Sequence, residues 1–286
     1  MFAYQKAIQR MTIAIIILST LVVLAAFIYP HTGETYTFTT LRGEEVEIYG
    51  QGLYRFETIS IYAQAIAQDI VTLIVAIPLL IVSLFMSKNG AMRGRVLLTG
   101  TLAYFLYTYA SYSFLSAFNE AYLFYVAIFS LSLFAVILSF MSISPDELAS
   151  HIKAGYPRKG LGIFCLGVGG AIALMWLARI VPAILQEAPP IGLETASTLV
   201  IQSLDLGLVV PLGIFSGMLL LRNQNWGYLL GTVFLFKGTT LVIAVFVMGL
   251  NMMRMNVSGS FVEMGVFGVI TALAILFTIK VIKNIE

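Results

Sequence analysis

The sequence predicts an all-α integral membrane protein: a bundle of eight transmembrane helices with a small extracytoplasmic β-hairpin cap. Three observations support this fold class. Hydrophobic residues make up 59% of the 286 residues and charged residues only 10%, far from the composition of soluble proteins. Apolar stretches of about 20 residues, the length that crosses a bilayer, recur along the chain. Basic residues gather in alternate connecting segments, as expected for a multi-pass protein.

Eight segments have the length and apolar character of a membrane span. The first follows Lys6 and Arg10, as the apolar core of a signal peptide would. We interpret it as a retained helix, because it is long enough to span and lacks a clear small-residue cleavage site. Only the tripeptide NEA separates the third span from the fourth. The predicted spans are residues 11–29, 66–86, 96–118, 122–141, 161–185, 199–221, 227–250 and 261–282.

The distribution of Lys and Arg predicts the orientation in the membrane. Cytoplasmic connections are the ones enriched in basic residues. One side has only Arg42, Arg55 and Arg254, whereas the side of both termini has Lys6, Arg10, Lys88, Arg93, Arg95, Lys153, Arg158, Lys159, Arg222, Lys280 and Lys283. We therefore expect cytoplasmic N- and C-termini and a place in the plasma (inner) membrane of a bacterial-type cell.

The longest connection, residues 30–65, is rich in glutamate and lies on the predicted outer side. Its TYTFTT segment alternates aromatic residues with threonine, Arg42-Gly43 can turn the chain, and VEIY offers a second short strand. A small β-hairpin is therefore predicted. Two roles are open for it: a cover that packs on the helix ends, or a lid over a site.

Loosely recurring features predict two related four-helix halves with the same orientation, residues 1–143 and 161–286. The alternative is a coincidence of apolar composition. A cytoplasmic linker of residues 144–160 would join the halves. In this linker, Ser144 followed by Glu147 is typical of the start of a short helix. The recurring pairs are Pro30 with Pro182, Asp69 with Asp205, and Pro78 with Pro211.

Two charged residues inside predicted membrane spans indicate where a binding site or a buried ion pair would lie. Asp205 interrupts the sixth span and Lys237 the seventh, and a short loop joins these helices. An ionisable group inside a membrane is costly unless it meets a partner or water, so we expect the two to form an ion pair, with Arg179 as an alternative cation for Asp205. That pair either only fixes helix packing or also belongs to a binding cavity open to the outside.

Further polar residues could complete such a cavity. Gln202 lies on the helix face of Asp205, one turn away. Tyr104 and Tyr107 lie too deep in the third span for an interfacial aromatic belt. Arg179, Asp69 and Glu263 are placed near the outer ends of their spans. The predicted ligand-binding or proton-coupling set is therefore Asp205, Lys237, Arg179, Asp69, Glu263, Gln202, Tyr104 and Tyr107.

Several chemistries are argued against by the sequence. His31 and His151 fall on opposite sides of the membrane, which excludes bis-histidine haem ligation. The single cysteine, Cys165, excludes an internal disulfide and a redox pair. A carboxylate cluster for a hard cation is disfavoured by Arg179 and Lys237, which compete for the same oxygens. We therefore expect no metal and no cofactor, and the near-neutral charge of +2 argues against nucleic acid as a partner.

The sequence leaves three functional hypotheses. The leading one is a protein that binds or translocates a small polar or amphiphilic molecule through an outward-facing cavity with buried charges. The second is a non-catalytic accessory or scaffold subunit, with other membrane proteins as partners besides the bilayer. The third, a membrane enzyme that acts on a lipid, is the weakest, because no nucleophile, metal triad or histidine lies within reach of the charged residues.

Overall fold

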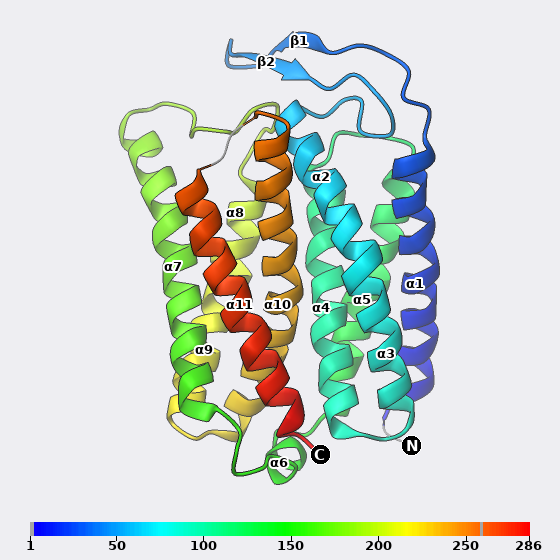
Figure 1. Ribbon diagram of the computed structural model, residues 1–286, viewed down its shortest axis with the longest axis vertical. Helices are drawn as coiled ribbons and strands as arrows, with labels where there is room; N and C mark the ends of the chain where they lie inside the picture. The colour runs from blue at the N-terminus through cyan, green and yellow to red at the C-terminus, as the bar shows by residue number, and fades with distance from the viewer. Residues whose placement is uncertain (1–2, 258–259) are drawn as a thin grey trace.

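The computed structural model describes residues 3–257 and 260–286 and shows long helices that run side by side (Figure 1). Two of the long helices contain a π-helical turn, labelled η1 and η2. The elements are α1 Gln5–Ile28, β1 Tyr36–Thr39, β2 Glu45–Ile48, α2 Ile59–Val71, η1 Thr72–Ala76, α3 Ile77–Lys88, α4 Met92–Leu115, α5 Tyr122–Ser142, α6 Pro145–Ser150, α7 Arg158–Leu185, α8 Val200–Leu204, η2 Asp205–Val209, α9 Val210–Leu221, α10 Asn225–Arg254 and α11 Phe261–Lys283.

Within the described ranges, seven helices are long and apolar enough to cross a membrane, which indicates a polytopic membrane protein. They are α1, α2–α3, α5, α7, α8–α9, α10 and α11. The remaining long helix, α4, covers the predicted third span and packs along α3, α5 and α10 (Figure 1). It is less apolar than the other seven. Its polar residues, including Arg95 and several threonines and tyrosines, are mostly buried against protein and so do not face lipid. Its crossing of the bilayer stays a prediction.

The predicted hairpin is confirmed. Strands β1 and β2 are antiparallel, with Tyr36 opposite Ile48. Gly43 lies in the connecting turn with φ +81°, a conformation that glycine adopts without strain. The predicted linker helix is also present as α6, where the Ser144 hydroxyl accepts a hydrogen bond from the Glu147 amide.

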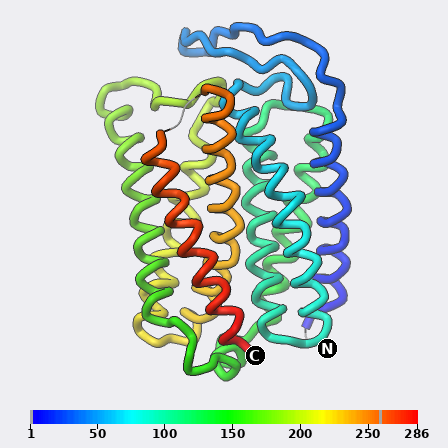
Figure 2. The backbone as a smooth tube through the Cα atoms, in the orientation of Figure 1, coloured from blue at the N-terminus to red at the C-terminus, as the bar shows by residue number. Residues whose placement is uncertain are grey.

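Both chain termini lie at the end of the bundle opposite the hairpin (Figure 2). We call these the terminal end and the hairpin end. The assignment of the terminal end to the cytoplasm stays a prediction. The second membrane helix begins at Ile59, earlier than predicted, because the Thr58 hydroxyl caps it by accepting from the Ile61 amide. Asp69 therefore lies about 15 Å along this helix and not near its end.

The two helices that contain a π turn share their local geometry. Each π turn ends just before a proline, Pro78 after η1 and Pro211 after η2. Proline lacks an N–H and clashes with the preceding helical turn, and a π turn absorbs that disruption. Thr72 begins η1 and Asp205 begins η2. These two residues are as far apart in the sequence as Pro78 and Pro211 are.

The helices that follow these two, α4 and α10, repeat the spacing between Pro78 and Pro211. Gly94 in α4 packs against the backbone of Met86, and Gly227 in α10 packs against the backbone of Leu219. In this register, Asp205 matches Thr72, one turn away from Asp69, and Gln202 matches Asp69. The sequence pairing of Asp69 with Asp205 is therefore displaced by one helical turn in this register. The agreement supports the two-half repeat, which we keep as a proposal.

Candidate functional site

A cavity of about 550 Å³ lies between the two proposed halves of the bundle. From the first half, α2 and α4 line it. From the second half, α7, α8, η2, α10 and α11 line it, together with the loop after α7. The cavity extends from Ser60, close to the start of α2 at the hairpin end, past Asp205 to Phe164, which lies nearer the terminal end.

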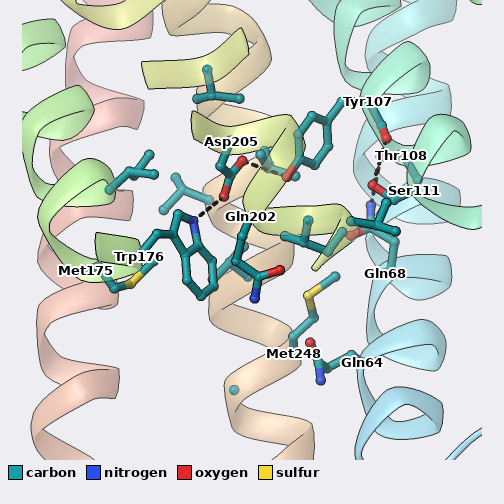
Figure 3. A pocket seen from close by; sticks show the side chains of 18 of the residues that line it. Gln64, Gln68, Tyr107, Thr108, Ser111, Met175, Trp176, Gln202, Asp205 and Met248 are labelled. Carbon is teal, nitrogen blue, oxygen red and sulfur yellow. Dashed lines mark hydrogen bonds between the residues drawn. The ribbon is translucent and has the colours of Figure 1, made fainter. Parts of the chain in front are cut away.

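Asp205 lines this cavity and is 9% exposed. One of its carboxylate oxygens, Oδ1, accepts a hydrogen bond of 2.7 Å from the Tyr107 hydroxyl. The other, Oδ2, accepts one of 2.8 Å from the Trp176 indole N–H (Figure 3). Two neutral donors from α4 and α7 therefore fix the carboxylate, which begins the π turn η2.

Lys237 does not form the direct ion pair expected with Asp205. The ion pairs found among the described residues are Arg55–Glu120, Arg95–Glu147 and Lys153–Glu286. The Lys237 ammonium instead lies 3.9 Å from the centre of the Tyr107 ring, a cation–π contact. It is buried and has no hydrogen-bond acceptor in the part of the chain that the structure describes. Tyr107 thus stands between the cation and the carboxylate.

Two close helix crossings bring the partners of Asp205 into place. A Cβ atom on Gly100 would lie 2.5 Å from Phe236 Cβ, so only glycine lets α4 approach α10 this closely. Gly169 also lies close to α9, where an added Cβ would be 3.3 Å from the Val210 carbonyl oxygen, a less severe contact. Tyr107 follows Gly100, and Trp176 follows Gly169, by about two helical turns. Each donor therefore lies on the helix face that its glycine turns towards the neighbouring helix.

The wall of the cavity formed by α2 and α4 is polar. Gln64, Gln68, Thr108 and Ser111 line it (Figure 3). The Gln68 amide donates to the Thr108 hydroxyl at 3.2 Å and also to the Tyr104 hydroxyl. Gln202 lines the cavity from α8, beside Asp205. Amide and hydroxyl groups of this kind can bind and orient a polar group.

Apolar side chains line the cavity from α7, α10 and α11, the helices that also contribute Arg179, Lys237 and Glu263. The apolar side chains include Met175, Met248, Met252 and Met264. Methionine is unbranched and flexible, so such a surface adapts to apolar groups of different shape. Gly238, next to Lys237, faces open space within the cavity, because a Cβ there would meet nothing within 4 Å.

The predicted site residues divide into two groups. Asp205, Lys237, Gln202, Tyr107, Arg179 and Glu263 line the cavity. Asp69 and Tyr104 are fully buried beside it and do not line it. Asp69 accepts from the Tyr54 hydroxyl at 2.6 Å and from the Tyr112 hydroxyl at 3.0 Å, so it anchors the hairpin-end segment to α4. Tyr104 bonds to Thr72 at 2.9 Å and holds α2 against α4 in the same way.

Segments at the hairpin end contact one another beside the cavity. The loop after α7 contributes Glu194 to the lining, and the Thr58 hydroxyl donates to the Glu194 carboxylate. Arg42, in the hairpin turn, donates to the backbone carbonyls of Ala196 and Ser197 at 3.3 and 3.2 Å. Burial raises the pKa of Glu57 to about 7, although its carboxylate accepts from the Ala117 amide.

Sequence reasoning missed several lining residues. Gln64 and Gln68 carried a signal, since two glutamines one turn apart in an apolar helix share a face. Trp176 carried a weaker one, one turn before Arg179 in the same span. The methionines gave no signal in the sequence. An apolar residue in a membrane span can face lipid, protein or a cavity, and the sequence looks the same in each case.

Comparison of the chain with models of protein families, with curated proteins and with solved structures gave no match. A function for this chain is therefore inferred from the geometry of the cavity.

Proposed function

We propose that this protein binds an amphiphilic molecule in the cavity between its two halves. The observation that carries the proposal is the mixed lining of the cavity. Lys237, Asp205 and the amides of α2 and α8 provide polar groups, and the methionines of α7, α10 and α11 provide apolar surface. A molecule with a polar headgroup and an apolar chain matches both at once, whereas a purely polar solute would leave the apolar surface in contact with water.

Lys237 argues for a bound ligand and not for packing alone. A buried ammonium has three N–H donors, and leaving them unbonded costs free energy. A residue that served packing only would have its acceptor within the protein. Lys237 contacts the Tyr107 ring and lies near the Asp205 charge, but it has no hydrogen-bond acceptor among the described residues and lines the cavity. A ligand oxygen is the acceptor that this geometry lacks.

The size of the cavity agrees with a small amphiphile. Ligand pockets typically have volumes of about 300–1,000 Å³. At about 550 Å³, the cavity has room for a headgroup and part of a single apolar chain. Translocation of the same ligand across the membrane would be the transport form of this function, with the hairpin-end segments beside the cavity as its gate.

Tryptophan fluorescence can test the binding directly. The chain has two tryptophans, Trp176 in the cavity and Trp226 at the terminal end. A Trp226→Phe variant in lipid nanodiscs would leave Trp176 as the reporter. Titration with brominated monolaurin, a single-chain amphiphile whose bromine atoms quench indole, should give saturable quenching.

A matched pair of variants separates the cavity from the lipid-facing surface. Gly238→Leu fills the cavity, whereas Gly167→Leu makes the same change on an exposed face of α7, where a Cβ also meets nothing within 4 Å. We expect Gly238→Leu to abolish saturable quenching and Gly167→Leu to preserve it. Equal quenching in both variants, or quenching that never saturates, would contradict the proposal and favour charges that serve packing only.

A further inference from the structure

The balance of charges around the cavity identifies the class of headgroup. We propose that the ligand is an amphiphile with no net charge, whose headgroup presents an acceptor oxygen to Lys237 while its chain lies along α7, α10 and α11. This inference rests on the proposed function and deepens it. Three features carry it: the enclosed charge pair, the charges nearer the hairpin end, and the apolar lining from α7 and α11.

The inner charges already compensate one another. Lys237 and Asp205 are both more than nine-tenths buried and face each other across one tyrosine. Groups that face the ammonium from neighbouring helices are Tyr107 of α4 and the Asp205 carboxylate that begins η2. A headgroup with a net charge would add an uncompensated ion to this enclosed space, and such ions are costly in a medium of low dielectric. An uncharged or zwitterionic headgroup adds none.

The charges nearer the hairpin end also disfavour a headgroup with a net charge. Arg179 lies beside Trp176, 5.7 Å from its ring centre, and one of its N–H groups donates to the Ile191 carbonyl. Two carboxylates, Glu194 and Glu263, line the same outer part of the cavity. These acidic groups oppose entry of an anion from the hairpin end. A cation would pass them but would meet the Lys237 ammonium inside.

The apolar chain has a place between α7 and α11. These two helices are the least buried of the seven candidate spans. They meet through Phe164 and Phe277, whose ring centres lie 5.2 Å apart, at a level nearer the terminal end. Phe164 itself lines the cavity, and towards the hairpin end both helices continue the lining, α7 with Ile172 and Met175, and α11 with Met264 and Phe267. A chain seated on these residues continues towards the hydrocarbon of the bilayer.

A headgroup series tests the inference. All probes carry the same lauryl chain and compete with brominated monolaurin for Trp176 in the Trp226→Phe protein. They are monolaurin, which is uncharged; laurylphosphocholine, which is zwitterionic; laurate, above the pKa of its carboxyl group; and lauryltrimethylammonium. We expect the two probes without net charge to bind at least about tenfold more tightly than either ion, which corresponds to about 1.4 kcal/mol.

Charge variants should then reverse the preference. Asp205→Asn leaves Lys237 uncompensated, so laurate should become the tightest of the four probes. Lys237→Gln leaves Asp205 uncompensated, so lauryltrimethylammonium should become the tightest. Tightest binding of laurate or lauryltrimethylammonium by the unsubstituted cavity would overturn the inference, even if the variants fail to fold. If no probe competes and quenching does not saturate, the proposed function itself fails, which is a separate result.

Discussion

The Lys237 ammonium lies 3.9 Å from the centre of the Tyr107 ring, while the hydroxyl of the same tyrosine donates to Asp205. One neutral side chain therefore bonds to two buried charges of opposite sign. The two charges do not contact each other directly. The ammonium therefore remains available to a ligand, and the carboxylate is held by Tyr107 and Trp176. A direct ion pair would have used at least one of the three ammonium donors.

Two substitutions of Tyr107 should separate its two contacts. Tyr107→Phe keeps the ring under the ammonium and removes the bond to Asp205, which should cost about 1.5–3 kcal/mol, the usual value for a hydrogen bond to a charged group. Tyr107→Leu also removes the cation–π contact and should cost about 0.5–2 kcal/mol more. Thermal unfolding in one detergent would compare them. Equal losses for both variants would show that the ring does not stabilise Lys237.

The crossing of α4 and α10 should tolerate no methyl group at Gly100. A Cβ there would lie 2.5 Å from Phe236 Cβ, so Gly100→Ala should destabilise the fold by about 1–3 kcal/mol through overpacking. Gly167→Ala is the matched control, because its Cβ meets nothing within 4 Å. That change should stabilise slightly, as replacement of a helical glycine by alanine does. A drop in melting temperature for both variants would point to a general effect of the substitution.

Stability should fall as the pH rises through the range in which Glu57 titrates. Burial raises its pKa from 4.5 to about 7 in the folded protein, so between these values the folded state holds a proton that the unfolded state has released. The stabilisation from this group is complete below about pH 4.5 and is lost by about pH 7, with a difference on the order of 3 kcal/mol.

The melting temperature of a Glu57→Gln variant, measured over the same pH range, is the control. We expect its pH dependence to be flatter than that of the unsubstituted protein. Glu120 acts in the opposite direction, because Arg55 lowers the pKa of this exposed carboxylate to about 2 and its contribution is lost only in stronger acid. A slope that survives in Glu57→Gln would assign the effect to another group.

The segment between the hairpin and α2 should loosen when its anchor is removed. Tyr54 is 2% exposed and donates to Asp69 at 2.6 Å, so Tyr54→Phe removes a bond to a buried carboxylate without opening a large cavity. We expect limited proteolysis within residues 30–58 to become several-fold faster. Arg42→Ala should have a smaller effect, because the Arg42 bonds to Ala196 and Ser197 are exposed. A larger effect of Arg42→Ala would place the main anchor at the loop after α7.

The sequence by itself determined the class of the molecule, the hairpin and the linker helix. These depend on local properties: the length of apolar runs, the alternation of Tyr36 and Phe38 with threonine, and the Ser144 cap. It also located the buried charges, because Asp205 and Lys237 stand out in apolar segments. The start of α2 was set too late because Ser60 and Gln64 are polar, yet both line the cavity as part of the helix.

The tertiary structure alone decided which partner each charge takes. A shift of one residue turns a side chain by about 100° around a helix, and each π turn adds such a shift. Position along a span therefore does not reveal that Asp205 accepts from Trp176, or that Asp69 is bonded to Tyr54 away from the cavity. The methionine lining has the same origin: helix rotation, not composition, decides which apolar side chains face a ligand.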